Sequence, residues 1–151
     1  MAVSRGLRRL LEVRVLEEEL RKATLEEALG DLRRLEAVLD GAQERERNGR
    51  RQVTASAGSA DVADRIAGLE ETRSAGRHVA ALKPRIAELE VEVAARRAEF
   101  LAKRIERRQA ETLIRKAEAA DAVAAGRRAQ RELDDWFLGQ AERSDGAVEE
   151  S

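Results

Sequence analysis

The sequence predicts an all-α protein in which two long helices form an antiparallel coiled-coil hairpin with an irregular, partly helical bend. Of the 151 residues, 59 are charged and 28 are Ala, a composition that favours long helices and coiled coils. The only aromatic residues are Phe100, Trp136 and Phe137, so the chain lacks the side chains that dominate a globular core. The net charge of -1 and the abundance of Ala argue against a disordered chain.

The first long helix is expected within residues 1–47, because residues 7–47 contain no Pro and show a helical apolar pattern. The spacing is close to 3.6, the period of a nearly straight amphipathic helix. Residues 25–42 alternate steps of three and four, as in a coiled-coil seam. The apolar or small positions are Leu10, Val13, Leu16, Leu20, Thr24, Ala28, Leu32, Leu35, Leu39 and Ala42.

A bend is expected at residues 48–78, where the apolar pattern fails. Asn48-Gly49 is a turn signal, and residues 54–59 are small or polar. Ser59 or Asp61 could cap a short helix after them, and Gly76 is expected to end or weaken it.

The second long helix is expected at residues 79–139, and an acidic, disordered tail at 140–151. Pro84 interrupts its start, which favours a kink or a new helix start there over an unbroken helix. If residue 47 pairs with about residue 79, Leu10 lies near residue 116 and the second helix overhangs by roughly 20 residues. The apolar residues at heptad positions of this helix, as far as Phe100, are Val79, Leu82, Ile86, Leu89, Val93 and Phe100.

The available chemistry argues against an enzyme, a cofactor site or a metal site. His78 is the only His, there is no Cys, and neither a GxGxxG nor a GxxxxGK[ST] phosphate loop occurs. No signal peptide or membrane span is expected, which indicates a cytoplasmic protein. Arg doublets are interpreted as a solvated face rather than a nucleic-acid site, because acidic residues balance them. These doublets are at residues 8–9, 33–34, 96–97, 107–108 and 127–128.

Trp136, Phe137 and Leu138 form the sharpest local feature. They could fold the helix end against its partner helix, or they could anchor a partner protein, since exposed Trp and Phe are typical of interface hot spots. Both interpretations stay open.

Three stretches carry a family resemblance. Residues 7–19 (LRRLLEVRVLEEE) are similar to an LLxLRxxxEE opening, residues 107–114 (RRQAETLI) to RKxxExL, and residues 127–135 (RRAQRELDD) to a closing RRxQKELDE. Their order and spacing resemble those of the FliJ family of flagellar type III export proteins, whose virulence-system relatives are the YscO-type stalks. Arg131 replaces the usual Lys, and the acidic tail exceeds the usual ending.

The resemblance implies a non-enzymatic stalk in the pore of the export ATPase hexamer, similar to the gamma subunit of rotary ATP synthases. Such a stalk promotes ATPase assembly and activity and contacts an export gate protein and export chaperones, with the bend towards the gate. It would be cytoplasmic and peripheral at the inner face of the cell membrane through its partners alone. The alternative is a generic coiled-coil scaffold or adaptor, and a virulence system also stays open. The matched positions, which become candidates for ATPase contact, are Arg8, Arg9, Arg14, Arg127, Arg128, Gln130, Arg131 and Asp134.

Overall fold

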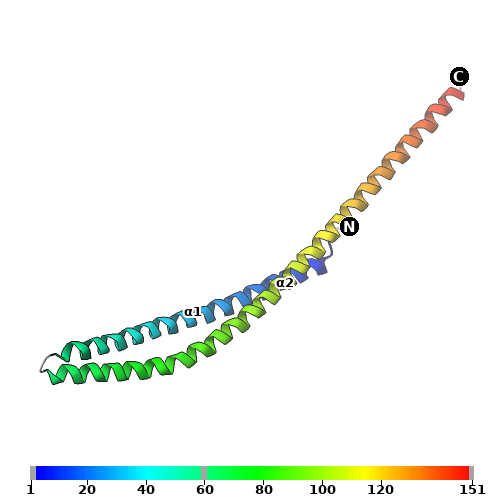
Figure 1. The fold of residues 1–151 in the computed structure, drawn as a ribbon. Coiled ribbons are helices and arrows are strands. Elements are labelled where there is room, and N and C mark those ends of the chain that lie inside the picture. Colours follow the sequence, from blue (N-terminus) through cyan, green and yellow to red (C-terminus); the bar gives the residue numbers. More distant parts are fainter. Residues whose placement is uncertain (1–2, 59–60, 150–151) are drawn as a thin grey trace. The chain divides into compact units, whose positions relative to one another are not determined.

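The computed structural model describes residues 3–58 and 61–149, and this part of the chain is helical with no strand. Helix α1 spans Arg5–Ser56 and helix α2 spans Val62–Glu149. The two run antiparallel as a hairpin, which confirms the fold class expected from the sequence (Figure 1). The chain divides into two units, one of residues 17–103 and one of residues 1–16 with residues 104–151.

Both helices begin at a polar cap. The Leu7 amide donates to Ser4 Oγ at 3.2 Å at the start of α1. At the start of α2, the amides of Ala63 and Asp64 donate to Asp61 Oδ1 at 3.1 and 3.3 Å. Asp61 is therefore a cap of α2, as expected from its residue type. Ser59, the other capping candidate, lies outside the described residues.

The connection between the helices is much shorter than the expected bend at 48–78. α1 continues to Ser56, a turn follows at residues 57–58, and α2 begins at Val62. Gly49 lies inside α1, at a position where the backbone of α2 approaches too closely to leave room for a side chain. A Cβ at Gly49 would lie 2.8 Å from the Gly68 carbonyl oxygen, and one at Gly68 would lie 2.9 Å from the Gly49 carbonyl oxygen. The Asn48-Gly49 signal therefore marks a close helix contact rather than a turn.

α2 passes through both positions at which a break was expected. Gly76 and Pro84 lie inside α2, so the expected start at 79 and the restart at Pro84 are wrong. The kink that was the other expectation at Pro84 is compatible with one continuous helix. Pro84 is exposed, while Leu82 and Ile86 on either side of it are buried against α1. Burial on both sides holds one helix across Pro84 and offsets its lost hydrogen bond.

Within the described part of residues 17–103, the core includes two small clusters along the seam between α1 and α2. One joins Leu25 and Ala28 of α1 to Val93 of α2, with Phe100 packed against it. The other joins Ala42 of α1 to Val79 and Leu82 of α2. These positions confirm the seam expected at residues 25–42 and 79–100.

The N-terminal part of the expected apolar face does not lie in the seam. Leu16 and Leu20 are 65% and 61% exposed, whereas Arg14 and Arg21 are half-buried and form ion pairs with α2. A row with a period of 3.6 drifts by about 20° per heptad from a seam with a period of 3.5. The heptad register thus continues through charged residues, and the apolar row turns to solvent.

The helix register and the C-terminal end also differ from the expectation. Arg45 contacts His78 Nδ1 at 2.9 Å, and Arg14 pairs with Glu106, so Leu10 lies nearer to residue 110 than to 116. α2 continues to Glu149 instead of ending at 139, and the expected disordered tail is helical through that residue. Residues 140–149 contain no Pro, which leaves the helix free to continue.

Candidate functional site

The N-terminal candidates lie in the first turns of α1, in the unit of residues 1–16 and 104–151. Arg8 and Arg9 are exposed and line a shallow hollow that Glu12 also borders. Arg14 instead lies in the seam, where Nη1 donates to Glu106 Oε2 at 3.0 Å. The Arg14 side chain is 32% exposed, so it is available to a second partner only in part. Arg8 and Arg9 are the accessible cations of this group.

The C-terminal candidates lie on α2 in the same unit, where every residue from 122 to 138 is exposed. Arg127, Arg128 and Arg131 line one hollow together with Asp121 and Ala124. Four of these five residues stand at the heptad positions that continue the seam: Asp121, Ala124, Arg128 and Arg131. The seam row is therefore small or charged along this part of α2.

Gln130 and Asp134 are linked within α2. Gln130 Nε2 donates to Asp134 Oδ1 at 3.0 Å, one helical turn apart. The contact fixes one end of the amide and leaves both side chains exposed.

Trp136, Phe137 and Leu138 are exposed by 57%, 62% and 64%. The Trp136 and Phe137 rings meet edge to face, with centroids 5.1 Å apart and planes at 76°. No described part of α1 covers them, so the structure does not place them as a staple onto the partner helix. Their apolar area is open to a binding partner.

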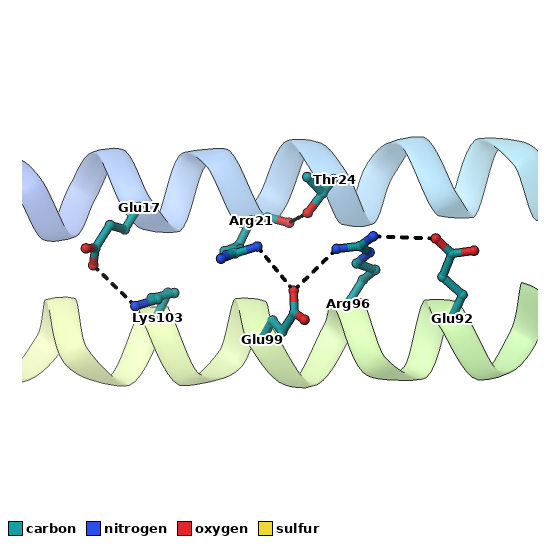
Figure 2. Close-up of polar contacts among 7 residues, drawn as sticks. All are labelled: Glu17, Arg21, Thr24, Glu92, Arg96, Glu99 and Lys103. Atoms are coloured by element: carbon teal, nitrogen blue, oxygen red, sulfur yellow. Dashed lines mark hydrogen bonds and ion pairs between the residues drawn. The ribbon is translucent and has the colours of Figure 1, made fainter.

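Sequence reasoning missed a ladder of ion pairs that crosses the seam within residues 17–103 (Figure 2). Glu17 of α1 pairs with Lys103 of α2 at 3.5 Å, and Arg21 of α1 pairs with Glu99 of α2 at 3.4 Å. Arg96 lies between Glu99 and Glu92, at 3.6 Å from each. A signal was present: Arg14 and Arg21 are seven residues apart, as are Glu99 and Glu106, so an antiparallel pairing matches both.

A second charged cluster lies on α1 towards the connection. Arg47 and Arg51 each pair with a Glu44 oxygen at 2.8 Å. Hydrogen bonds from Arg47 and Arg51 hold the pKa of Glu44 below its usual range. At the start of α2, a hydrogen bond and charge repulsion from Asp61 raise the pKa of Asp64.

The described residues provide surface and charge rather than a reaction centre. Residues 3–58 and 61–149 contain no group of three or more His, Asp or Glu side chains placed to hold a metal ion. Over the same residues, no helix is long and apolar enough to cross a membrane. The accessible features are the Arg residues at the start of α1, those at residues 127–131 of α2, and the Trp136–Leu138 surface.

Comparison with known proteins gives one family. A family model described as "Flagellar FliJ protein" matches residues 4–145, nearly the whole chain. No curated protein matches the chain. No solved structure matches it either. The matched span includes all of α1, α2 as far as residue 145, and all the candidate residues named from the sequence.

Proposed function

The chain belongs to the FliJ family of flagellar proteins, and from this premise we propose that it is the stalk of the flagellar export ATPase. Family membership makes it a protein of the flagellar export system. The family is a non-catalytic component of that system, and we propose that this chain also acts without catalysing a reaction. It inserts into the ATPase ring and promotes ring assembly and ATP turnover.

One observation carries the proposal: along residues 121–131 the seam row of α2 is small or charged, and its members Ala124, Arg128 and Arg131 are exposed. Leu or Ile at these positions would favour packing against another helix, as in the seam of the hairpin. Asp121, Ala124, Arg128 and Arg131 instead offer a surface that can contact a polar channel without tight apolar packing. Charge complementarity in such a contact sets orientation and specificity more than affinity.

Trp136, Phe137 and Leu138 supply the apolar part of the same contact. Together they expose three large side chains in a segment that is otherwise acidic. Buried Trp and Phe side chains account for much of the binding energy at many interfaces. We assign them to the ATPase ring, as an anchor next to the Arg surface.

The other partners follow from the family role. The end of the hairpin formed by the C-terminus of α1 and the N-terminus of α2 faces the export gate protein, and export chaperones bind along the hairpin. The protein works in the cytoplasm and reaches the inner face of the cell membrane through these partners alone. Arg8 and Arg9 contact the ATPase together with Arg127, Arg128, Gln130, Arg131 and Asp134.

The test is ATP turnover by the cognate export ATPase over a range of added stalk protein. We expect turnover to rise with the wild-type chain. The double change Arg127→Glu and Arg128→Glu should weaken the rise at least ~10-fold in effective concentration, because two contacts become repulsive. Helicity, measured by circular dichroism, should stay unchanged since both side chains are exposed.

A matched control is the double change Arg33→Glu and Arg34→Glu. This doublet is also exposed on a helix and undergoes the same change of charge, but it lies in the unit of residues 17–103. It should stimulate as the wild type does. Unchanged turnover at every ratio of wild-type chain to ATPase would leave only the scaffold interpretation.

A further inference from the structure

α2 carries a second row of coiled-coil positions that faces away from α1. We call it the outer row. Its members alternate in steps of four and three, the spacing at which one helix packs along another. All ten are exposed, and one of them is charged, in a chain in which 39% of residues are charged. They are Ile105, Gln109, Thr112, Lys116, Ala119, Val123, Gly126, Gln130, Leu133 and Phe137.

The large apolar members of the outer row are unusually open. Ile105, Val123 and Leu133 are each more than half exposed, at 56%, 55% and 52%. Ala110, on the side of α2 that packs on α1, is 3% exposed. Ile105 also borders a shallow hollow between Arg108 and Lys116, lined further by Gln109, Thr112 and Leu113. Side chains of a second molecule could therefore pack into this hollow.

The outer row matches itself when it is reversed. If two copies of α2 run antiparallel and cross at Asp121, every member of the row meets another member. Ile105 lies opposite Phe137, Gln109 opposite Leu133, and Thr112 opposite Gln130. Lys116 then meets Gly126, which leaves room for the longer side chain, and Ala119 meets Val123. A twofold axis that relates identical surfaces requires such a match.

The charges along α2 favour the same arrangement. Residues 104–131 carry eight basic and four acidic side chains, and residues 132–149 carry one basic and six acidic. In the antiparallel register centred on Asp121, residues 132–138 of each copy, with three acidic and no basic side chains, lie along residues 104–110 of the other, with three basic and one acidic. In a parallel pair, like charges would lie side by side, which opposes association.

We propose that the outer row binds a second copy of this chain, so that the C-terminal ends of two α2 helices form an antiparallel pair. A single helix exposed to water on all sides is only marginally stable. Pairing covers the apolar members of the row in both copies. The inference does not depend on contact with an ATPase.

Sedimentation velocity of the full chain over a concentration series tests the pairing. We expect a monomer–dimer equilibrium that strengthens as salt is lowered. Ala119→Glu places a charge in the row beside Val123 of the other copy, and should raise the dissociation constant at least ~10-fold. Ala125→Glu is the matched control, since Ala125 is also exposed and lies outside the row, about 100° or more around the helix from its nearest members. It should leave the equilibrium unchanged.

Disulfide formation tests the orientation, because the chain has no Cys of its own. A mixture of Gln109→Cys and Leu133→Cys chains should yield the mixed disulfide dimer under mild oxidation. Preferential linkage of Gln109→Cys chains to each other would indicate a parallel pair and overturn the proposal. A monomer at all concentrations, or an equal effect of Ala119→Glu and Ala125→Glu, would overturn it as well. The ATP-turnover assay has a separate readout, so failure of either proposal is distinguishable from failure of the other.

Discussion

At the scale of single residues, Gly49 shows how close packing replaces apolar burial in a chain with few large side chains. A Cβ at Gly49 would lie 2.5 Å from Thr72 Oγ1 and 2.8 Å from the Gly68 carbonyl oxygen. Thr72 Oγ1 itself donates to that carbonyl oxygen at 2.8 Å. Gly49 and Gly68, together with a Thr72 hydroxyl that bonds to its own helix backbone, therefore let α1 and α2 approach closely where no Leu is present.

Gly49→Ala should lower the free energy of unfolding by about 1–3 kcal/mol, because the added methyl group meets backbone atoms that cannot move alone. Gly41→Ala is the control, since Gly41 is exposed in the same helix and a Cβ there meets nothing within 4 Å. That change should raise stability by about 1 kcal/mol through helix propensity. Urea unfolding followed by circular dichroism measures both. Equal effects of the two substitutions would contradict the close contact.

At the scale of the elements, α2 is one helix across Pro84 because its neighbours in the seam are buried on both sides of that residue. Leu82 is 4% and Ile86 8% exposed, whereas Pro84 faces solvent. The Pro ring therefore meets water rather than α1. Its cost is a missing hydrogen bond and a local distortion of the helix.

Pro84→Ala should raise the free energy of unfolding by about 1–3 kcal/mol, because it restores the amide donor without changing the packed face. Thermal unfolding of the full chain measures the change. A midpoint equal to or lower than that of the wild type would mean that the helix does not run regularly through this position.

Much of the fold was accessible from the sequence at this scale. The seams at residues 25–42 and 79–100 were predictable because Leu, Ile and Val at heptad spacing act locally. The length of the bend was not, because Asn48-Gly49 is a turn signal unless another Gly faces it, and Gly68 lies 19 residues away. The charged seam was hidden for a similar reason: Arg14 and Arg21 indicate a contact only once they are paired with Glu106 and Glu99.

The candidate site was predictable in its location, while its roles rest on the family. Composition and spacing identified Trp136, Phe137 and the Arg doublet at 127–128, and the structure finds them exposed. The outer row was not identified from the sequence, since Ala, Gly, Gln and Thr give little hydrophobic signal. Only the position of α1 indicates which side of α2 is left free.

At the scale of the whole molecule, the net charge of -1 conceals a separation of charge along the chain. Residues 132–151 carry seven acidic side chains and one Arg, and the rest of the chain is basic on balance. Both proposals use this separation at the same end of α2. Phe137 belongs both to the outer row and to the proposed ATPase anchor, so pairing of two copies should compete with binding to the ring.

The most direct test of the central claim is site-specific crosslinking to the assembled export ATPase. Since the chain has no Cys, one photocrosslinker can be placed through Ala129→Cys, next to Arg128, and another through Ala37→Cys on an exposed face of α1. The stalk proposal predicts that the probe at 129 links to the ATPase and saturates at one chain per ring, while the probe at 37 links far less. Equal linkage from both positions, or linkage that never saturates, would contradict insertion of the α2 end into the ring.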